Sequence, residues 1–189
     1  MLRDFLDRDM IEQITLLEEI QMSGRNELLP ALVDLYATPH ADQAVDESVY
    51  HALFALLAKD GAAVVACLRH PAERVRLVAM RRAGVDLVPE AKAVLVEQLR
   101  TASRPEVLAA TIKAVGLFDD PRLADLIAPL IDHGDDMVAV AAMQALVGLK
   151  GEEGRQSLQP LVVRLSAEAG NGRGSLKLAE AVRLAGKKE

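Results

Sequence analysis

The sequence predicts an all-α protein, a right-handed α-solenoid (superhelix) of about five antiparallel helix pairs plus a C-terminal capping helix. The first observation behind this prediction is a set of apolar positions that repeats every 31 to 32 residues. The second is composition, because 51% of the residues are hydrophobic but only 3% are aromatic, which suits closely packed helix pairs. A repeat of this length cannot bury its apolar face alone and must stack on its neighbours.

Two ladders of equivalent apolar residues carry the repeat. The first ladder has three sets: Val75, Val107 and Val138; Met80, Ile112 and Met143; Ala83, Val115 and Leu146. The second has two sets at a spacing of 31: Leu68, Leu99, Leu130 and Leu161; Val65, Val96, Ile127 and Leu158. We expect the first ladder to lie on the first helix of each pair and the second ladder on the second helix.

Capping and helix-breaking residues divide the chain into about eleven helical segments. The first ends at Ser23-Gly24, since glycine suits the left-handed residue just past a helix, and Asn26 caps the second. Asp120, Asp135 and Ser103 stand at later helix starts as caps or cap neighbours. The expected segments are 4–22, 26–37, 42–59, 61–69, 71–84, 88–101, 104–118, 121–132, 135–149, 152–169 and 175–185.

Prolines fall at two kinds of position. Four of them open helices, where the missing N–H is not needed: Pro71, Pro89, Pro105 and Pro121. Pro129 and Pro160 fall 31 residues apart inside their segments, where proline removes a hydrogen bond. We expect a matched kink in the second helix at both prolines, or a break into two short helices.

We expect residues 1–189 to form a single repeat domain with three parts. Residues 1–60 are divergent N-terminal pairs, rich in acid with 12 acidic and 4 basic residues, and residues 61–169 are the regular repeats. Residues 170–189 are a linker and the capping helix. The linker, Gly170-Asn-Gly-Arg-Gly, lacks the Lys-Ser/Thr pair of a phosphate-binding loop.

Three stretches carry a family resemblance: Glu73-Arg-Val-Arg-Leu-Val-Ala-Met-Arg-Arg-Ala-Gly, Pro105-Glu-Val-Leu-Ala-Ala-Thr-Ile-Lys-Ala-Val-Gly and Asp136-Met-Val-Ala-Val-Ala-Ala-Met-Gln-Ala-Leu-Val. Each resembles the first helix of a HEAT repeat of the short bacterial kind, also described as HEAT-like or PBS-lyase-like. The resemblance covers about residues 60 to 169. It implies a helical-repeat protein of bacterial type, but this fold serves many functions and does not select one.

Five arginines fall within 14 residues: Arg69, Arg74, Arg76, Arg81 and Arg82. Their guanidinium groups could hold a phosphate or an acidic partner. Alternatively the cluster is structural, with Arg76 tying neighbouring turns together through Asp86 or Asp119. If the cluster binds a partner, we expect reversal of Arg74, Arg81 and Arg82 to Glu to abolish capture without unfolding the array.

The histidines and the cysteine do not indicate a metal site or a catalytic group. The four histidines are dispersed, so we expect no metal site; protonated rings of His70 and His133 would suit the carboxyl ends of helices. Cys67 lies in an apolar helix and is expected to be a buried, inert thiol. With no catalytic constellation, we expect no enzyme and no cofactor.

The leading functional prediction is a protein-interaction scaffold or adaptor that binds a protein partner across a concave surface of mixed charge. The apolar pattern predicts no membrane segment and a cytoplasmic protein, and we expect a monomer or weak homodimer. The candidate partner-binding residues are Arg69, Arg74, Arg81, Arg82, Arg100, Asp132, His133 and Arg164, with Asp125 beside them.

Two alternatives stay open. One is a nucleic-acid-binding protein of the alkylated-base DNA glycosylase type, which the net charge of −6 and the absence of Trp disfavour. The other is a phycobilin-lyase-like protein that handles a chromophore, for which no motif carries over. Neither nucleic acid nor a membrane is therefore an expected partner.

Overall fold

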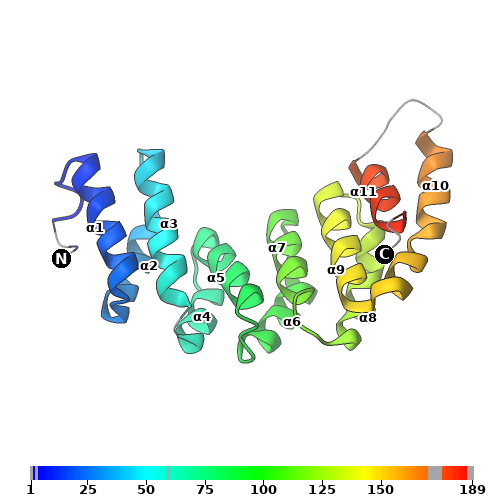
Figure 1. Ribbon diagram of the computed structural model, residues 1–189, viewed down its shortest axis with the longest axis horizontal. Helices are drawn as coiled ribbons and strands as arrows, with labels where there is room; N and C mark the ends of the chain where they lie inside the picture. The colour runs from blue at the N-terminus through cyan, green and yellow to red at the C-terminus, as the bar shows by residue number, and fades with distance from the viewer. Residues whose placement is uncertain (1, 3, 59, 170–175, 187–189) are drawn as a thin grey trace. The chain divides into compact units, whose positions relative to one another are not determined.

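The computed structural model describes residues 2, 4–58, 60–169 and 176–186. In this part every regular element is helical, with eleven α-helices and three short 3-10 helices (Figure 1). The predicted all-α solenoid fold is therefore confirmed. By its internal packing the chain divides into two compact units, Met1–Val94 and Leu95–Glu189. The segment predicted as a linker, residues 170–174, lies outside the described residues.

In the first unit, helices pack both on the next helix in the chain and on helices further along it. Helix α1 packs on α3, and both α2 and α3 pack on α5, which also contacts α4. A 3-10 turn at Asn26–Leu28 precedes α2, and α6 begins in this unit and continues into the second. The helices are α1 (Met10–Ser23), α2 (Leu29–Ala37), α3 (Gln43–Leu57), α4 (Gly61–Leu68), α5 (Glu73–Val85) and α6 (Ala91–Thr101).

Aspartate side chains set the starts of three of these helices. Asp9, Asp42 and Asp60 each accept hydrogen bonds from backbone N–H groups of the first turn. The first predicted helix, 4–22, was wrong at its start, because Asp9 caps α1 at Met10 and the preceding residues form turns around the buried Phe5. Its end was right, since Gly24 takes the left-handed conformation with φ 63°.

The second unit contains α7 (Pro105–Val115), α8 (Ala124–Ile127), α9 (Asp136–Ser157), α10 (Gln159–Ala169) and α11 (Leu176–Ala185). Two 3-10 helices flank α8, at Pro121–Leu123 and Ala128–Asp132. Asp120 and Asp135 accept backbone N–H groups as predicted, and Ser103 is a cap neighbour, since the N-cap of α7 is Arg104.

The two internal prolines break their segments. Before Pro129 the α-helix ends and a 3-10 helix continues, and Pro160 lies at the second residue of a new helix, α10. The expected matched kink is therefore wrong and the alternative of a break is correct. Gly151 adds a further break inside α9, with φ 54° and ψ −123°, between the expected segments 135–149 and 152–169.

The first apolar ladder is buried at all nine positions. The second ladder is only partly correct, because Val65, Val96 and Leu130 are half-buried. In α4 and α6 the buried positions are the neighbours Val64 and Leu95, which lie on the core-facing stripe with Leu68 and Leu99. The predicted repeat length is thus correct. At these two sites, however, the buried residue of the second helix is one position earlier than predicted.

Helices α7 and α9 approach closely because a glycine lies between them. A Cβ atom built on Gly116 lies 2.5 Å from the Cβ of Ala145 and 2.9 Å from its Cα. The contact involves backbone, so the neighbouring helix must shift to admit a side chain. Gly134 differs, since a Cβ built there meets nothing within 4 Å.

Gly116→Ala is expected to destabilise the second unit by about 1–3 kcal/mol through overpacking. Urea denaturation followed by circular dichroism measures this as a lower unfolding midpoint. Gly134→Ala is the matched control and should leave the midpoint close to that of the unmodified protein. Equal midpoints for the two variants would show that α7 and α9 are not in this close contact.

Candidate functional site

Three of the five Phe and Tyr residues in the chain lie together in the first unit, beside the arginines of α5. The rings come from α2 and α3, so the helix packing brings them to α5. We name this cluster the arginine-aromatic surface: Tyr36, Tyr50, His51, Phe54, Arg74, Arg81 and Arg82.

Arg74 forms the inner end of this surface. Its guanidinium lies 3.9 Å from the ring centroid of Tyr36 and donates a hydrogen bond of 2.5 Å to Asp46. Asp46 also accepts the backbone N–H of His40 at 3.0 Å. Burial alone would raise the pKa of Asp46, but the hydrogen bonds from Arg74 and His40 outweigh it and hold that pKa below its ordinary value.

Arg82 is also held inside the unit. Its guanidinium forms two hydrogen bonds with the carboxylate of Asp86, one helical turn away, and lies 4.5 Å from the ring centroid of Phe54. Reversal of Arg74 or Arg82 to Glu would bring two carboxylates together. We therefore expect the triple reversal to destabilise the first unit as well as to remove the three cations.

Arg81 is the exposed member of the three. Its Nη1 donates a 2.6 Å hydrogen bond to the hydroxyl of Tyr50, and its guanidinium lies 5.4 Å from the ring centroid of Phe54. Tyr50 and Phe54 are themselves stacked, with centroids 5.8 Å apart and planes 15° apart, and exposed His51 packs edge-on against Tyr50. The rings thus fix the direction of a guanidinium that has five N–H donors.

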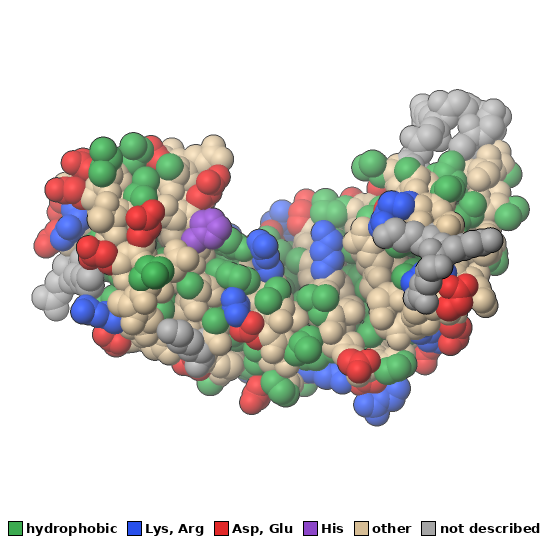
Figure 2. Space-filling view, in the orientation of Figure 1, with side chains coloured by type: hydrophobic (Ala, Val, Ile, Leu, Met, Phe, Trp, Pro, Cys, Tyr) green, Lys and Arg blue, Asp and Glu red, His purple; other side chains and the backbone are tan. Residues whose placement is uncertain are grey.

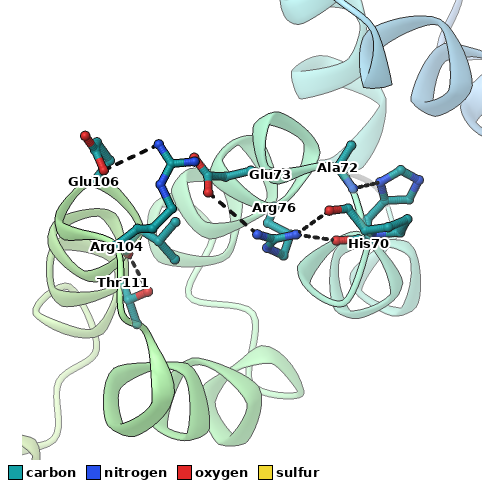
Figure 3. Close-up of polar contacts among 9 residues, drawn as sticks. His70, Ala72, Glu73, Arg76, Arg104, Glu106 and Thr111 are labelled. Atoms are coloured by element: carbon teal, nitrogen blue, oxygen red, sulfur yellow. Dashed lines mark hydrogen bonds and ion pairs between the residues drawn. The ribbon is translucent and has the colours of Figure 1, made fainter.

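Arg76 and His70 have structural roles in the loop before α5 (Figure 3). Arg76 donates to the carbonyl oxygens of His70 and Pro71 at 2.8 and 2.7 Å and pairs with Glu73 at 3.8 Å. The structural interpretation of Arg76 is correct, but its partners are these groups and not the expected Asp86 or Asp119.

His70 and His133 lie just past the ends of α4 and of the 3-10 helix Ala128–Asp132, as expected. The Nδ1 atom of His70 accepts the backbone N–H of Ala72 at 3.1 Å, and Nδ1 of His133 accepts that of Asp135 at 3.0 Å. Both rings hold the loop that leads into the next helix.

The remaining predicted residues do not form one cluster. Asp132 and Arg164 form an ion pair at a pocket of about 240 Å³ that Pro160 and Leu161 also line. Arg69 is exposed in the first unit, and Arg100 and Asp125 are exposed in the second. The carbonyl oxygen of His133 accepts a hydrogen bond from Lys177 at 3.2 Å.

A groove of about 510 Å³ in the second unit was not predicted. Helices α7, α9 and α11 line it, with Lys113, Met137, Val140, Leu176 and Arg183 among its residues. The signal in the sequence was Met137, a large apolar residue outside both ladders, which is 46% exposed.

The described residues offer no site for metal or thiol chemistry. No group of three His, Cys, Asp or Glu side chains among them is placed to hold a metal ion. Burial and, after it, the charge of Asp60 raise the pKa of the Cys67 thiol, which opposes the reactive thiolate. In the same part of the chain, each helix is too short or too polar to cross a bilayer.

Residues 92–169 match the family model of HEAT repeats, from the start of α6 to the end of α10. No curated protein matches the chain.

The lowered pKa of Asp46 predicts a pH-dependent contribution to stability. Above about pH 4, where an unfolded aspartate is ionised, the Asp46 contacts are complete, and Asp46→Asn should cost about 1–2 kcal/mol. As the pH falls through the lower pKa of folded Asp46, this contribution is lost in the unmodified protein. The two proteins should therefore converge in unfolding midpoint at acidic pH. A difference that is constant from pH 7 to pH 2 would contradict the ion pair.

Proposed function

We propose that this chain, in which residues 92–169 match the family model of HEAT repeats, is a non-enzymatic adaptor that binds an acidic segment of a protein partner through the arginine-aromatic surface. HEAT repeats generally act as protein-interaction scaffolds. The observation that carries the proposal is Arg81, exposed and fixed in direction by Tyr50 and Phe54.

The chemistry of Arg81 favours a carboxylate partner. Its planar guanidinium can form two parallel hydrogen bonds to a carboxylate, and the stacked rings reduce the conformational entropy that binding would otherwise remove. Half-buried Tyr50 and Phe54 and exposed His51 add apolar contact area beside it. Arginine and aromatic residues are the types most enriched where binding energy concentrates in protein interfaces.

The same surface suits a nucleic acid less well. Residues 1–94 carry 15 acidic and 10 basic residues, so a polyanion meets net repulsion. Tyr50 and Phe54 stack on each other and lie against arginines, so a base that stacked on them would compete with contacts already made.

The test is affinity capture of the tagged protein from its own host at moderate salt, with the bound material identified by mass spectrometry. Arg81→Glu should reduce the recovery of one dominant protein at least tenfold, because it repels an acidic segment. Arg69→Glu, an equal charge change at an exposed position of the same unit, should leave that recovery unchanged.

Both variants must keep the unfolding midpoint of the unmodified protein. Undiminished capture by Arg81→Glu would refute the assigned surface. Recovery of nuclease-sensitive nucleic acid or of a pigment in place of a protein would refute the adaptor function.

A further inference from the structure

The groove of about 510 Å³ in the second unit is lined by α7, α9 and α11, which pack side by side in that order. None of the partner-binding residues predicted from the sequence lines it. Its volume falls within the range of about 300–1,000 Å³ that is typical of binding clefts. Figure 2 shows hydrophobic side chains over the part of this unit in which α9 and α11 begin. The groove is therefore a candidate binding surface that the proposed function does not use.

One end of the groove is apolar. Helices α9 and α11 run in the same direction (Figure 1), and Gln144 of α9 donates a 2.7 Å hydrogen bond to Glu180 of α11. Val140 and Leu176 each stand four residues before this bonded pair, and both line the groove. Met137 lies one turn nearer the start of α9. Leu176 is 75% exposed and Met137 46% exposed, so this end offers large apolar side chains in a concave surface.

The acidic group at the other end is already satisfied. Gln144 donates to one carboxylate oxygen of Glu180, and Arg183 forms two hydrogen bonds with the same carboxylate. The Glu180 side chain is only 14% exposed, whereas that of Arg183 is 48% exposed. This ion pair therefore adds no net charge to the groove, and its more exposed member is the cation.

Lys113 of α7 adds a positive charge that this pair does not cancel. Ile112 and Met143 are equivalent positions of the first ladder, so Lys113 stands at the level of Gln144. Lys113 is exposed, and in the described part of the chain no acidic side chain pairs with it. Asp136 also lines the groove, but it lies eight residues before Gln144, about 12 Å along the helix axis. The groove is thus positive at one end and negative at the other.

The spacing of these groups matches the repeat of an α-helix. Met137, Val140 and Gln144 follow one another along α9 at intervals of one turn and together span about 10 Å. A second helix laid along α9 would place one side chain over each of these levels. Helices bind grooves of this kind through apolar residues spaced by three or four positions. The third level, beside Lys113, suits an acidic side chain.

We propose that this groove binds an amphipathic helix of a protein partner. The helix has two large apolar side chains one turn apart, and an acidic side chain one turn further along. The apolar side chains contact Met137, Val140 and Leu176, and the carboxylate contacts Lys113. Asp136 repels an acidic residue at the other end, so the charges select which end of the helix lies beside Lys113.

The test is a selection on the immobilised full chain from a phage-displayed library of random peptides of about 16 residues, or four to five helical turns. Selected peptides are labelled with fluorescein, and their Kd is measured by fluorescence polarisation. We expect one enriched class with large apolar residues spaced by three or four positions and Asp or Glu three or four positions beyond them. The circular dichroism of the complex should show that these peptides gain helix on binding.

Two variants alter the two ends of the groove separately. Lys113→Glu reverses the charge that the acidic side chain contacts, and the double variant Met137→Ser with Leu176→Ser removes the exposed apolar contacts. Each should weaken the binding of the enriched peptides by about tenfold or more. Added salt should weaken binding to the unmodified protein but should have little effect on the residual binding to Lys113→Glu.

Matched controls make the same chemical changes at exposed positions outside the groove. Arg100→Glu reverses a charge, and Leu117→Ser with Val163→Ser removes two apolar side chains that are 54% and 70% exposed. Arg81→Glu alters the arginine-aromatic surface alone. All three should bind the enriched peptides with unchanged Kd. Each variant is first checked for the unfolding midpoint of the unmodified protein.

Three results would overturn the proposal. The first is a selection in which no enriched peptide loses affinity in the Lys113 and Met137 variants. The second is a set of groove-dependent peptides whose apolar residues alternate and which gain no helix, because this indicates an extended segment. The third is a set that lacks acidic residues and binds Lys113→Glu normally. Arg81 is unchanged in the groove variants, so these results leave the proposed adaptor function to its own test.

Discussion

Burial of one helix face against the next pair is the interaction on which the rest of the structure depends. Each helix pair has too little apolar surface to form a core alone, so its side chains must meet those of its neighbours. All nine positions of the first ladder are buried, as this constraint requires. Where the approach is closest, between α7 and α9, the sequence provides Gly116 opposite Ala145.

This stacking explains how much of the fold was predictable. The repeat length, the all-α class and most helix limits follow from apolar spacing and from Asp caps, which act over a few residues. The sequence did not predict which side of α4 and α6 is buried. In α4, for example, Val64 and Val65 are equally apolar, and only the position of the neighbouring helices decides which of them is buried. The start of α1 was also predicted wrongly. Phe5 lies in a turn but is buried, so its position fits the apolar spacing of a helix.

The candidate site was predictable in part for the same reason. Arg74, Arg81 and Arg82 were recognised as a cluster, but their aromatic partners, which lie about one repeat earlier, were not predicted. Tyr50 stands 31 residues before Arg81, and Asp132 stands 32 residues before Arg164. Residues one repeat apart on neighbouring helices therefore touch, and this spacing was the signal that could have found both pairs. The sequence does not predict which of the three arginines is exposed. Asp86 holds Arg82, but the spacing of Arg81 from its neighbours gives no sign that Arg81 is the exposed one.

The central claim is that stacking in this register places Arg81 on the rings of the preceding repeat. A double-mutant cycle with Tyr50→Leu and Arg81→Gln tests it most directly, with the free energy of unfolding as the measured quantity. If the residues touch as described, the two changes should be non-additive by about 0.5–1 kcal/mol. Fully additive effects would contradict the contact, and with it the register from which the site is built.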